Sequence, residues 1–517
     1  MTSCINSSTF KSSTLQLINY STLQLSAMKL FFLSIFFIPL SVNSQALMPR
    51  PITLNEAIIL ARKQSVDAAS ARSELKAAYW NYRSFRATLL PEVNLEATLP
   101  SYRKNYNVYQ QDDGSHTYVR NNYLTLHGNL SVSQNLWLTG GTLSLNSSLD
   151  YLTQLGTSHH RQQFMSVPLV LTLNQPLFSV NATKWNRRIE PVRYREAQAR
   201  FLTATEEVTM KTIEYYFNIL LARENVSIAK LNLENAEKLQ LAAETKRSMG
   251  KISENDLLQL RLNVLNARSS LTTSVSEQQS AMFTLRSFLT LGEGEELVPQ
   301  LPEQIETLTL AYPEVLRKAL ERNAFTHNLR RRQLEADYEV ARAKGNRRQV
   351  SLFAQVGLTG YGDAIAPAYT HTKDNQVVEV GVRLPLLDWG KRRGQVKVAE
   401  SRREVVRQQI RKEEADFQQR LFVLTERFNN QQDQLHIARE ADKIARKRYQ
   451  NNVETFLIGR ISTLDLNDAQ SGKDEARRKY ISELLNYWYA YYQLRSLTLW
   501  DFATHCNIDA DFDEIVR

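Results

Sequence analysis

The chain has 517 residues with a formal net charge of +10, and 43% of its residues are hydrophobic. This composition excludes an intrinsically disordered protein and leaves enough apolar material for a large core or several domains. It contains 17 Gly and 13 Pro, about half of the usual combined share of roughly 12%, which predicts long uninterrupted helices.

The positive charge does not indicate a nucleic-acid partner. The basic runs Arg330–Arg332 and Arg402–Arg403 alternate with acids such as Glu335, Asp337 and Glu400, which is typical of a solvated helix surface. The sequence contains none of the nucleic-acid-binding modules with defined spacing, no His-Glu-x-x-His motif, no pair of metal-ligating cysteines and no phosphate-binding glycine loop. We therefore expect no nucleic acid, no enzyme activity, no cofactor and no metal site.

The N-terminal region carries the pattern of an export signal. An apolar run at 30–42 is interrupted by Ser34 and Pro39 and falls short of the ~18 residues that a membrane-spanning helix needs. Lys29 precedes this run and small residues follow it, as in a signal peptide. Residues 1–44 are therefore predicted to be an upstream extension and signal peptide, with Met28 as the better initiator. A buried N-terminal helix is the alternative.

The chain repeats itself at an offset of 209 residues, because the stretch 250–257 recurs as 459–466 with Gly, Ile, Ser, Asp and Leu in register. The segments 175–178 and 384–387 match at the same offset. Self-similarity of this kind predicts a duplicated structural unit. We place the first repeat at 45–298, a linker at 299–312, the second repeat at 313–501 and a C-terminal tail at 502–517.

Each repeat begins with an amphipathic helical stretch, at 54–90 and at 313–347, and continues into strands. Apolar and polar residues alternate over 93–99 and over 378–384, which predicts strands with one apolar and one polar face. Such strands suit either a sandwich that buries the apolar face or a transmembrane barrel that turns it towards lipid.

Long helices follow the strands. Residues 192–291 contain no Pro and a single Gly, Gly250, which predicts a helix from about Thr183 to Met249, on the order of 100 Å long at 1.5 Å per residue. Gly250 and its counterpart Gly459 are expected to end the long helices, since Gly tolerates the left-handed conformation found there. Each repeat is thus predicted to contain a long helical hairpin.

The chain combines a predicted signal peptide, a duplicated helix-strand-strand-helix-helix order and a Gly-x-x-Ser-x-x-Asp-Leu tip in both repeats. Together these features resemble the TolC-like outer-membrane efflux channel family, from about Leu54 to Asp501. The resemblance implies a mainly α fold with β, in which duplicated α-hairpins form a periplasmic α-barrel. The strands then contribute to a trimeric transmembrane β-barrel.

The same resemblance implies a function and a set of partners. The function is passive exit for substrates through the outer membrane of a Gram-negative bacterium, with the helical part in the periplasm. The partners are two further copies in a homotrimer, a periplasmic adaptor, an inner-membrane transporter of the RND, ABC or MFS class, and outer-membrane lipid. The runner-up is an exported coiled-coil stalk or adaptor without a pore.

Two groups of site residues follow from the resemblance. Asp465 and Asp468 fall where the family narrows its periplasmic aperture with acidic residues, although a helix-start acid near the positive end of the helix dipole is the alternative. The family also implies contact between its hairpin tips and the adaptor, and the alternative is a tip that only turns the chain. The tip residues are Gly250, Lys251, Ile252, Ser253, Gly459, Arg460, Ile461 and Ser462.

The sequence departs from the family at the latch that holds the aperture shut. The family places a tyrosine and a basic residue where Phe456 and Ile461 stand here. A hydrogen-bonded latch of the family's type is therefore not expected. Lys251 and Arg460 are the candidates for a salt-bridged closure instead.

The first repeat carries 48 more residues than the second before its Gln-Pro motif, and we assign them to a hairpin at about 115–163 with its turn at Gly140–Gly141. The hairpin either adds two membrane strands, giving eighteen in a trimer, or extends outside the cell and leaves twelve. We favour the extracellular hairpin because the barrel must match the circumference of the helical tunnel. Trp137, Phe178 and Trp389 near strand ends suit either an aromatic girdle or a packed core.

Overall fold

The computed structural model describes residues 50–155, 162–250, 252–292, 297–302, 308–347, 349–383, 387–457, 460–461 and 463–517. The chain divides into two units, Met1–Met48 and Pro49–Arg517. All described residues belong to the second unit.

The helices of the two repeats match almost residue for residue in length. The first repeat contains α1 (Leu54–Gln64), α2 (Val66–Ala87), α3 (Ala182–Ser248) and α4 (Glu254–Phe288), of 11, 22, 67 and 35 residues. The second contains α5 (Tyr312–Arg322), α6 (Ala324–Gly345), α8 (Lys391–Leu457) and α9 (Thr463–Thr498), of 11, 22, 67 and 36 residues. Two short helices, α7 (Ile365–Thr370) and α10 (Phe512–Val516), are the remaining helices of the described residues.

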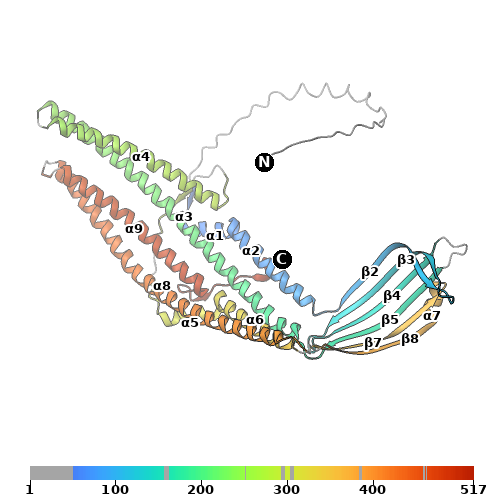
Figure 1. The fold of residues 1–517 in the computed structure, drawn as a ribbon. Helices are drawn as coiled ribbons and strands as arrows, with labels where there is room; N and C mark the ends of the chain where they lie inside the picture. The colour runs from blue at the N-terminus through green and yellow to red at the C-terminus, as the bar shows by residue number, and fades with distance from the viewer. Residues whose placement is uncertain are drawn as a thin grey trace, which may run out of the picture. The chain divides into compact units, whose positions relative to one another are not determined.

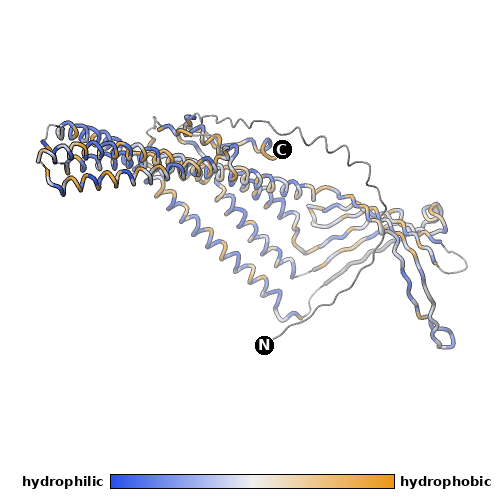
Figure 2. The backbone as a smooth tube through the Cα atoms, turned by 90° about the horizontal axis from the view of Figure 1, so that it is seen from above, coloured by the Kyte–Doolittle hydropathy of each residue, from blue (hydrophilic) through white to orange (hydrophobic). Residues whose placement is uncertain are grey.

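The long helices pack as hairpins. α3 lies along α4 and α9, and α8 lies along α9 and α6 (Figure 1). α2 and α4 both pack on α3, so two shorter helices flank one long helix. Among the described residues no helix combines the length and apolar character needed to cross a membrane, and Figure 2 shows hydrophilic residues throughout the long helices.

One sheet contains six strands in the order β2-β3-β4-β5-β7-β8, and every neighbouring pair is antiparallel. The strands are β2 (Glu92–Gln110), β3 (His116–Asn135), β4 (Thr142–Gln154), β5 (Gln162–Pro176), β7 (Gln349–Gly362) and β8 (Thr372–Arg383). Two small sheets pair β1 (Arg50–Ile52) with β6 (Leu297–Pro299), and β9 (Trp500–Asp501) with β10 (Cys506–Asn507).

The main core lies among α1, α3, α5, α8 and α9, around fully buried side chains such as Phe217, Leu421 and Phe428. Tyr216 of α3 joins this core to the β1–β6 pair, since its hydroxyl lies 2.6 Å from the Gln300 carbonyl oxygen and accepts the Gln300 amide at 2.8 Å. Burial raises the pKa of Tyr216 to about 12. The hydroxyl therefore stays protonated at neutral pH and keeps these hydrogen bonds.

The expectation that the Arg330–Arg332 region forms a solvated surface is wrong for two of its members. Arg331 lies 2.6 Å from Glu196 of α3, and Arg332 lies 2.6 Å from Glu413 of α8, with only 20% and 25% of their side chains exposed. The alternating charges connect α6 to its neighbouring helices, because the flat guanidinium can reach a carboxylate across a helix interface.

Candidate functional site

The six-stranded sheet has one apolar and one polar face. Side chains alternate along a strand, so the register decides which residues share a face. Leu130 of β3 lies opposite Leu95 of β2, and Leu171 of β5 lies opposite Val356 of β7. Nine large apolar side chains of this face are 37–77% exposed in the single chain, namely Val93, Leu95, Leu126, Leu130, Leu145, Leu169, Leu171, Val356 and Leu358.

The opposite face carries hydrogen-bonding and charged groups. Glu96 lies opposite Asn129, and His127 lies opposite Asp150 with 2.6 Å between His127 Nδ1 and Asp150 Oδ1. Asn94, Ser131, Asn146, Thr172 and Gln355 share this face. A sheet of this kind can separate lipid from water, with the polar groups facing water.

Both edges of the sheet are open within one chain. Among the strands that the structure describes, β2 pairs with β3 alone, and β8 pairs with β7 alone. In lipid, each unpaired backbone group would cost several kcal/mol. The sheet therefore needs further strands to pair its edges if it is to stand in a bilayer.

The turn between β3 and β4 lies at the helical end of the sheet. Gly140 has a φ of +79°, and Asn181, which caps the start of α3, donates from Nδ2 to the Trp137 carbonyl oxygen at 2.8 Å. A Cβ on Gly141 would lie 2.3 Å from Gln175 Oε1. The turn is thus packed against the segment that links β5 to α3.

The preference for an extracellular hairpin is therefore wrong. β3 and β4 pair along their lengths between β2 and β5, so their backbone groups are satisfied inside the sheet. β3 and β4 are joined by a tight turn and bring no additional helix into the bundle, so the circumference of a helical tunnel does not fix the number of strands.

The aromatic residues near the strand ends do not form a packed core. Trp137, Phe178 and Trp389 are 43%, 60% and 90% exposed, and each follows the helical end of a strand. The Arg187 guanidinium lies 3.9 Å from the centroid of the Trp137 ring. These exposed rings fit the girdle alternative.

The first hairpin tip turns at the predicted glycine. Gly250 has a φ of +70°, and its amide donates to the Arg247 carbonyl oxygen at 2.9 Å. Ile252 and Ser253 lead into α4, and Arg247 Nη1 donates to the Ile252 carbonyl oxygen at 3.3 Å. The helix-ending role predicted for Gly250 is confirmed, and its docking role stays a prediction.

Part of the predicted tip set lies outside the described residues, namely Lys251, Gly459 and Ser462. In the second tip the Arg460 amide donates to the Thr455 carbonyl oxygen at 3.1 Å, and Ile461 follows it. The salt-bridged closure by Lys251 and Arg460 likewise stays a prediction.

Asp465 and Asp468 lie in the first turns of α9 on its exposed side, whereas Leu466 and Ala469 are buried. Asp468 Oδ2 lies 2.5 Å from Nη2 of Arg448 on α8, and both side chains are more than half exposed. We had not anticipated Arg448. It stands eleven residues before Gly459 and Asp468 nine after it, so counting outward from the tip along two antiparallel helices would have found the pair.

A buried ion cluster that the sequence did not reveal joins α1, α3 and α9. The fully buried Glu206 lies 2.7 Å from Arg62 and 3.4 Å from Arg495, and Arg495 lies 2.9 Å from Asp501. Burial raises the pKa of Glu206 although both arginines oppose the shift. The cluster connects α1 to α9, the last long helix.

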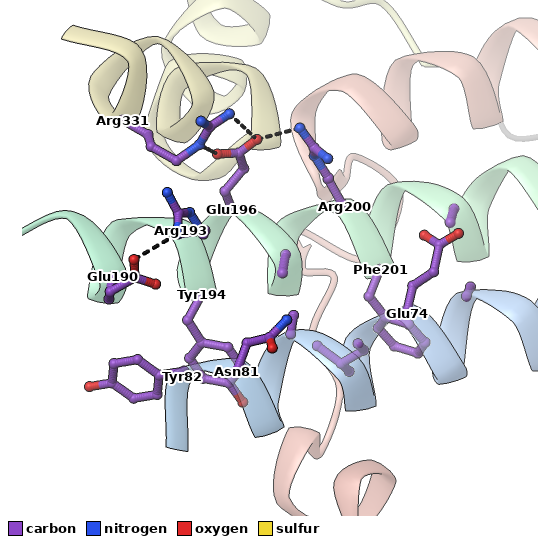
Figure 3. Close-up of a pocket in the computed structure, with 15 residues that line it drawn as sticks. Glu74, Asn81, Tyr82, Glu190, Arg193, Tyr194, Glu196, Arg200, Phe201 and Arg331 are labelled. Carbon is purple, nitrogen blue, oxygen red and sulfur yellow. Dashed lines mark hydrogen bonds and ion pairs between the residues drawn. The ribbon is translucent and has the colours of Figure 1, made fainter. Parts of the chain in front are cut away.

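A second cluster joins α3 to α6 across the two repeats (Figure 3). Glu196 is bonded to Arg331 at 2.6 Å, to Asn328 at 2.9 Å and to Arg200. Burial acts to raise the pKa of Glu196, but the hydrogen bonds from Arg331 and Asn328, together with the positive charges of Arg331 and Arg200, outweigh it and lower the pKa.

The cavity beside this cluster is lined by α2 and α3, where the rings of Tyr82 and Tyr194 stack with centroids 5.1 Å apart. Around the cavity, Arg193 pairs with Glu190, and Arg200 and Arg331 pair with Glu196 (Figure 3). Over the part of the chain that the structure describes, no three His, Cys, Asp or Glu residues come together as a metal site.

A family model described as "Outer membrane efflux protein" matches residues 57–290 and 320–498. The chain belongs to this family. The computed structure is similar to the CmeC outer membrane channel of Campylobacter jejuni, with a TM-score of 0.63, 15% identity, and coverage of 89% of this chain and 88% of that one. It is also similar to VceC of Vibrio cholerae, with a TM-score of 0.59, 16% identity, and coverage of 88% and 97%.

Among curated proteins, the chain is similar to the cobalt-zinc-cadmium resistance protein CzcC of Cupriavidus metallidurans, with 24% identity over 297 residues. The alignment covers 56% of this chain and 66% of that relative, just under two thirds of its length. The family and the mainly α fold with β that the sequence predicted are confirmed by these comparisons.

Proposed function

We propose that the chain forms a homotrimeric channel in the outer membrane of a Gram-negative bacterium, through which substrates leave passively. The observation that carries the proposal is the sheet with an apolar face, a polar face and two open edges. Pairing of β2 of one copy with β8 of the next closes the sheet into a barrel and satisfies the edges. The family match supports an efflux role for that barrel.

Three copies would supply eighteen strands, because each described chain contributes six. The apolar face then contacts lipid and the polar face lines a wet lumen. The two extra strands of the first repeat make this barrel wider than a barrel built from four strands per chain.

The periplasmic part of the proposal assigns the partners. The hairpin tips at Gly250–Ser253 and Gly459–Ser462 contact the adaptor, and Asp465 with Asp468 surrounds the aperture. An inner-membrane transporter delivers the cargo, so the channel itself performs no catalysis. The name of the curated relative makes cobalt, zinc and cadmium ions the first cargo to test.

The alternative of a stalk or adaptor without a pore accounts for the helical hairpins alone. It gives no role to exposed residues such as Leu95 and Leu171 on one face of a sheet whose other face carries Glu96 and Asp150. The channel uses both faces.

Reconstitution into planar bilayers tests the channel. The full protein should need detergent for extraction from the outer membrane and should conduct ions afterwards. Gly141→Val should abolish the pore, since a Cβ there meets Gln175 and the Asn174 carbonyl oxygen. Gly128→Val is the matched control, because a Cβ on Gly128 meets nothing within 4 Å. A wild-type protein that is released without detergent and does not conduct would establish the stalk.

A further inference from the structure

The short helix α7 between β7 and β8 packs on the apolar face of the sheet. Ser166 of β5 donates from Oγ to the Ala368 carbonyl oxygen at 2.6 Å, and Ala368 is fully buried. A Cβ on Gly360 would lie 1.8 Å from that same oxygen, and a Cβ on Gly362 would lie 2.7 Å from Pro367. Three small residues therefore open the sheet surface to receive this helix.

The register identifies the face that α7 covers. Ser166 lies opposite Gly360, and Leu169 lies opposite Leu358, on one side of the β5–β7 pair. Gly360 is two residues from Leu358 along a regularly paired strand, so both point to the same face. That face is the exposed apolar one, and the polar face lies on the other side of the sheet.

Along the sheet, α7 stands where the apolar band ends. Counted from the helical end of β5, Leu173, Leu171 and Leu169 come before Ser166 on the apolar face. Phe164 comes after it, opposite Gly362, and Gln162 is the outermost residue of the strand. Figure 1 shows α7 at the end of the sheet remote from the helices. In a bilayer this position corresponds to the boundary between hydrocarbon and head groups on the outer side.

The outward side of α7 suits that boundary. Ile365 and Tyr369 are four residues apart, which places them on one side of a helix, and they are 51% and 40% exposed. A tyrosine ring with its polar hydroxyl is favoured at the head-group level, and an aliphatic side chain is favoured just below it.

We propose that α7 is an interfacial anchor whose Ile365 and Tyr369 insert into the outer leaflet of the membrane around the barrel. The inference rests on the proposed channel, because it takes the apolar face as the lipid face. It assigns the β7–β8 connection to the outside wall of the barrel and to contact with lipid.

Fluorescence quenching tests the anchor in the full protein, reconstituted in phosphatidylcholine vesicles. Tyr369→Cys in a Cys4→Ser, Cys506→Ser background carries an environment-sensitive dye, and Ser115→Cys in the β2–β3 loop carries the same dye as a water-exposed reference. The dye at 369 should show a blue-shifted emission and lose intensity with lipids that bear a nitroxide near the head group. The dye at 115 should instead lose intensity with aqueous iodide.

A pair of glycine variants provides the matched control. Gly360→Val forces α7 off the sheet and should make the dye at 369 sensitive to iodide, whereas Gly128→Val on the same face leaves space and should change nothing. If iodide quenched the dye at 369 as strongly as the dye at 115 in the protein without a glycine substitution, that result would overturn the anchor. Protection from both quenchers would also overturn it and would show that a second copy covers α7.

Conductance of the labelled vesicles separates the two proposals. A conducting protein with an iodide-accessible dye at 369 contradicts the anchor alone. A protein that does not conduct contradicts the channel on which the anchor rests.

Discussion

Asp468 and Arg448 form an ion pair across the second helical hairpin, so the proposed aperture combines carboxylates with nearby arginines. Removing the carboxylates leaves Arg448 without its partner at the same level. Of the charges of Asp465, Asp468 and Arg448, only the positive charge of Arg448 then remains. The passage of cations becomes less favourable as a result.

We predict that Asp465→Asn combined with Asp468→Asn lowers the cation preference of the reconstituted channel and weakens block by multivalent cations. Bi-ionic reversal potentials and titration of single-channel current with the blocker measure both effects. Glu254→Gln is the control, because Glu254 is an exposed carboxylate at the first tip, 76% accessible. Unchanged conductance, selectivity and block in the double variant would place the constriction elsewhere.

Glu196 illustrates a residue whose charge serves stability. Its pKa is lowered in the folded protein, so its contribution to stability is fully present above the ordinary pKa of the carboxyl group. The contribution is lost as the pH falls through the lowered folded value. At neutral pH the ionised carboxylate accepts bonds from Arg331 and Asn328.

We predict that Glu196→Gln lowers the free energy of unfolding by about 2 kcal/mol at neutral pH, the scale of a charge-assisted hydrogen bond, with the deficit shrinking at acid pH. Thermal unfolding in detergent, followed by the helical circular dichroism signal across pH, measures it. Glu339→Gln removes an exposed ion pair with Arg342 and should cost less than about 1 kcal/mol. If Glu196→Gln lowered the free energy of unfolding by the same amount at neutral and at acid pH, the loss would come from packing and not from the charge.

At the scale of elements, the β3–β4 hairpin has the clearest consequence. Its turn packs on the start of α3, and the β2–β3 loop at Asp113–Ser115 lies at the opposite end of the same strands. In the proposed channel the helices lie in the periplasm, so the turn would face the periplasm and the loop would face the outside of the cell.

We predict that Thr139→Cys, in a background without native cysteines, reacts with a membrane-impermeant maleimide only after the outer membrane has been permeabilised. Ser115→Cys is the matched site and should react in intact cells. Both residues are exposed in the single chain. Labelling of Thr139→Cys in intact cells would show that the hairpin turn lies outside the cell.

At the scale of the whole molecule, the outer helices present apolar surface that one chain does not cover. α4 packs along α3 and exposes Leu258, Leu262 and Leu265, and α8 exposes Ile437 and Ile444. Each of these five side chains is at least 49% exposed. Contact between α4 of one copy and α8 of the next would bury both surfaces in the interface of the proposed trimer.

We predict that Leu262→Glu reduces the trimer population, because a charge replaces an apolar contact in the interface. Native mass spectrometry of the detergent-solubilised protein counts the copies. Gln279→Glu adds the same charge at another exposed position of α4 and should leave the trimer intact. A Leu262→Glu protein with an undiminished trimer would exclude this face from the interface.

Local patterns in the sequence by themselves determined the helices, the strands and the duplication. The scarcity of Pro and Gly before Gly250 predicted a helix over Thr183–Met249, and α3 runs from Ala182 to Ser248 with Pro191 inside it. Period-two alternation likewise located the two-faced strands. These features depend on neighbours within a few residues, so they can be predicted without knowing the fold.

Tertiary structure alone decided which distant residues meet. It placed the Gly140–Gly141 turn against Asn181, set Glu196 between Arg331 and Asn328, and laid α7 on the apolar face through Ser166. Each of these contacts joins segments that are tens to hundreds of residues apart, and local periodicity is the same whichever partner a segment finds. Strand order and helix packing choose the partner, because backbone pairing and burial are satisfied across the whole molecule at once.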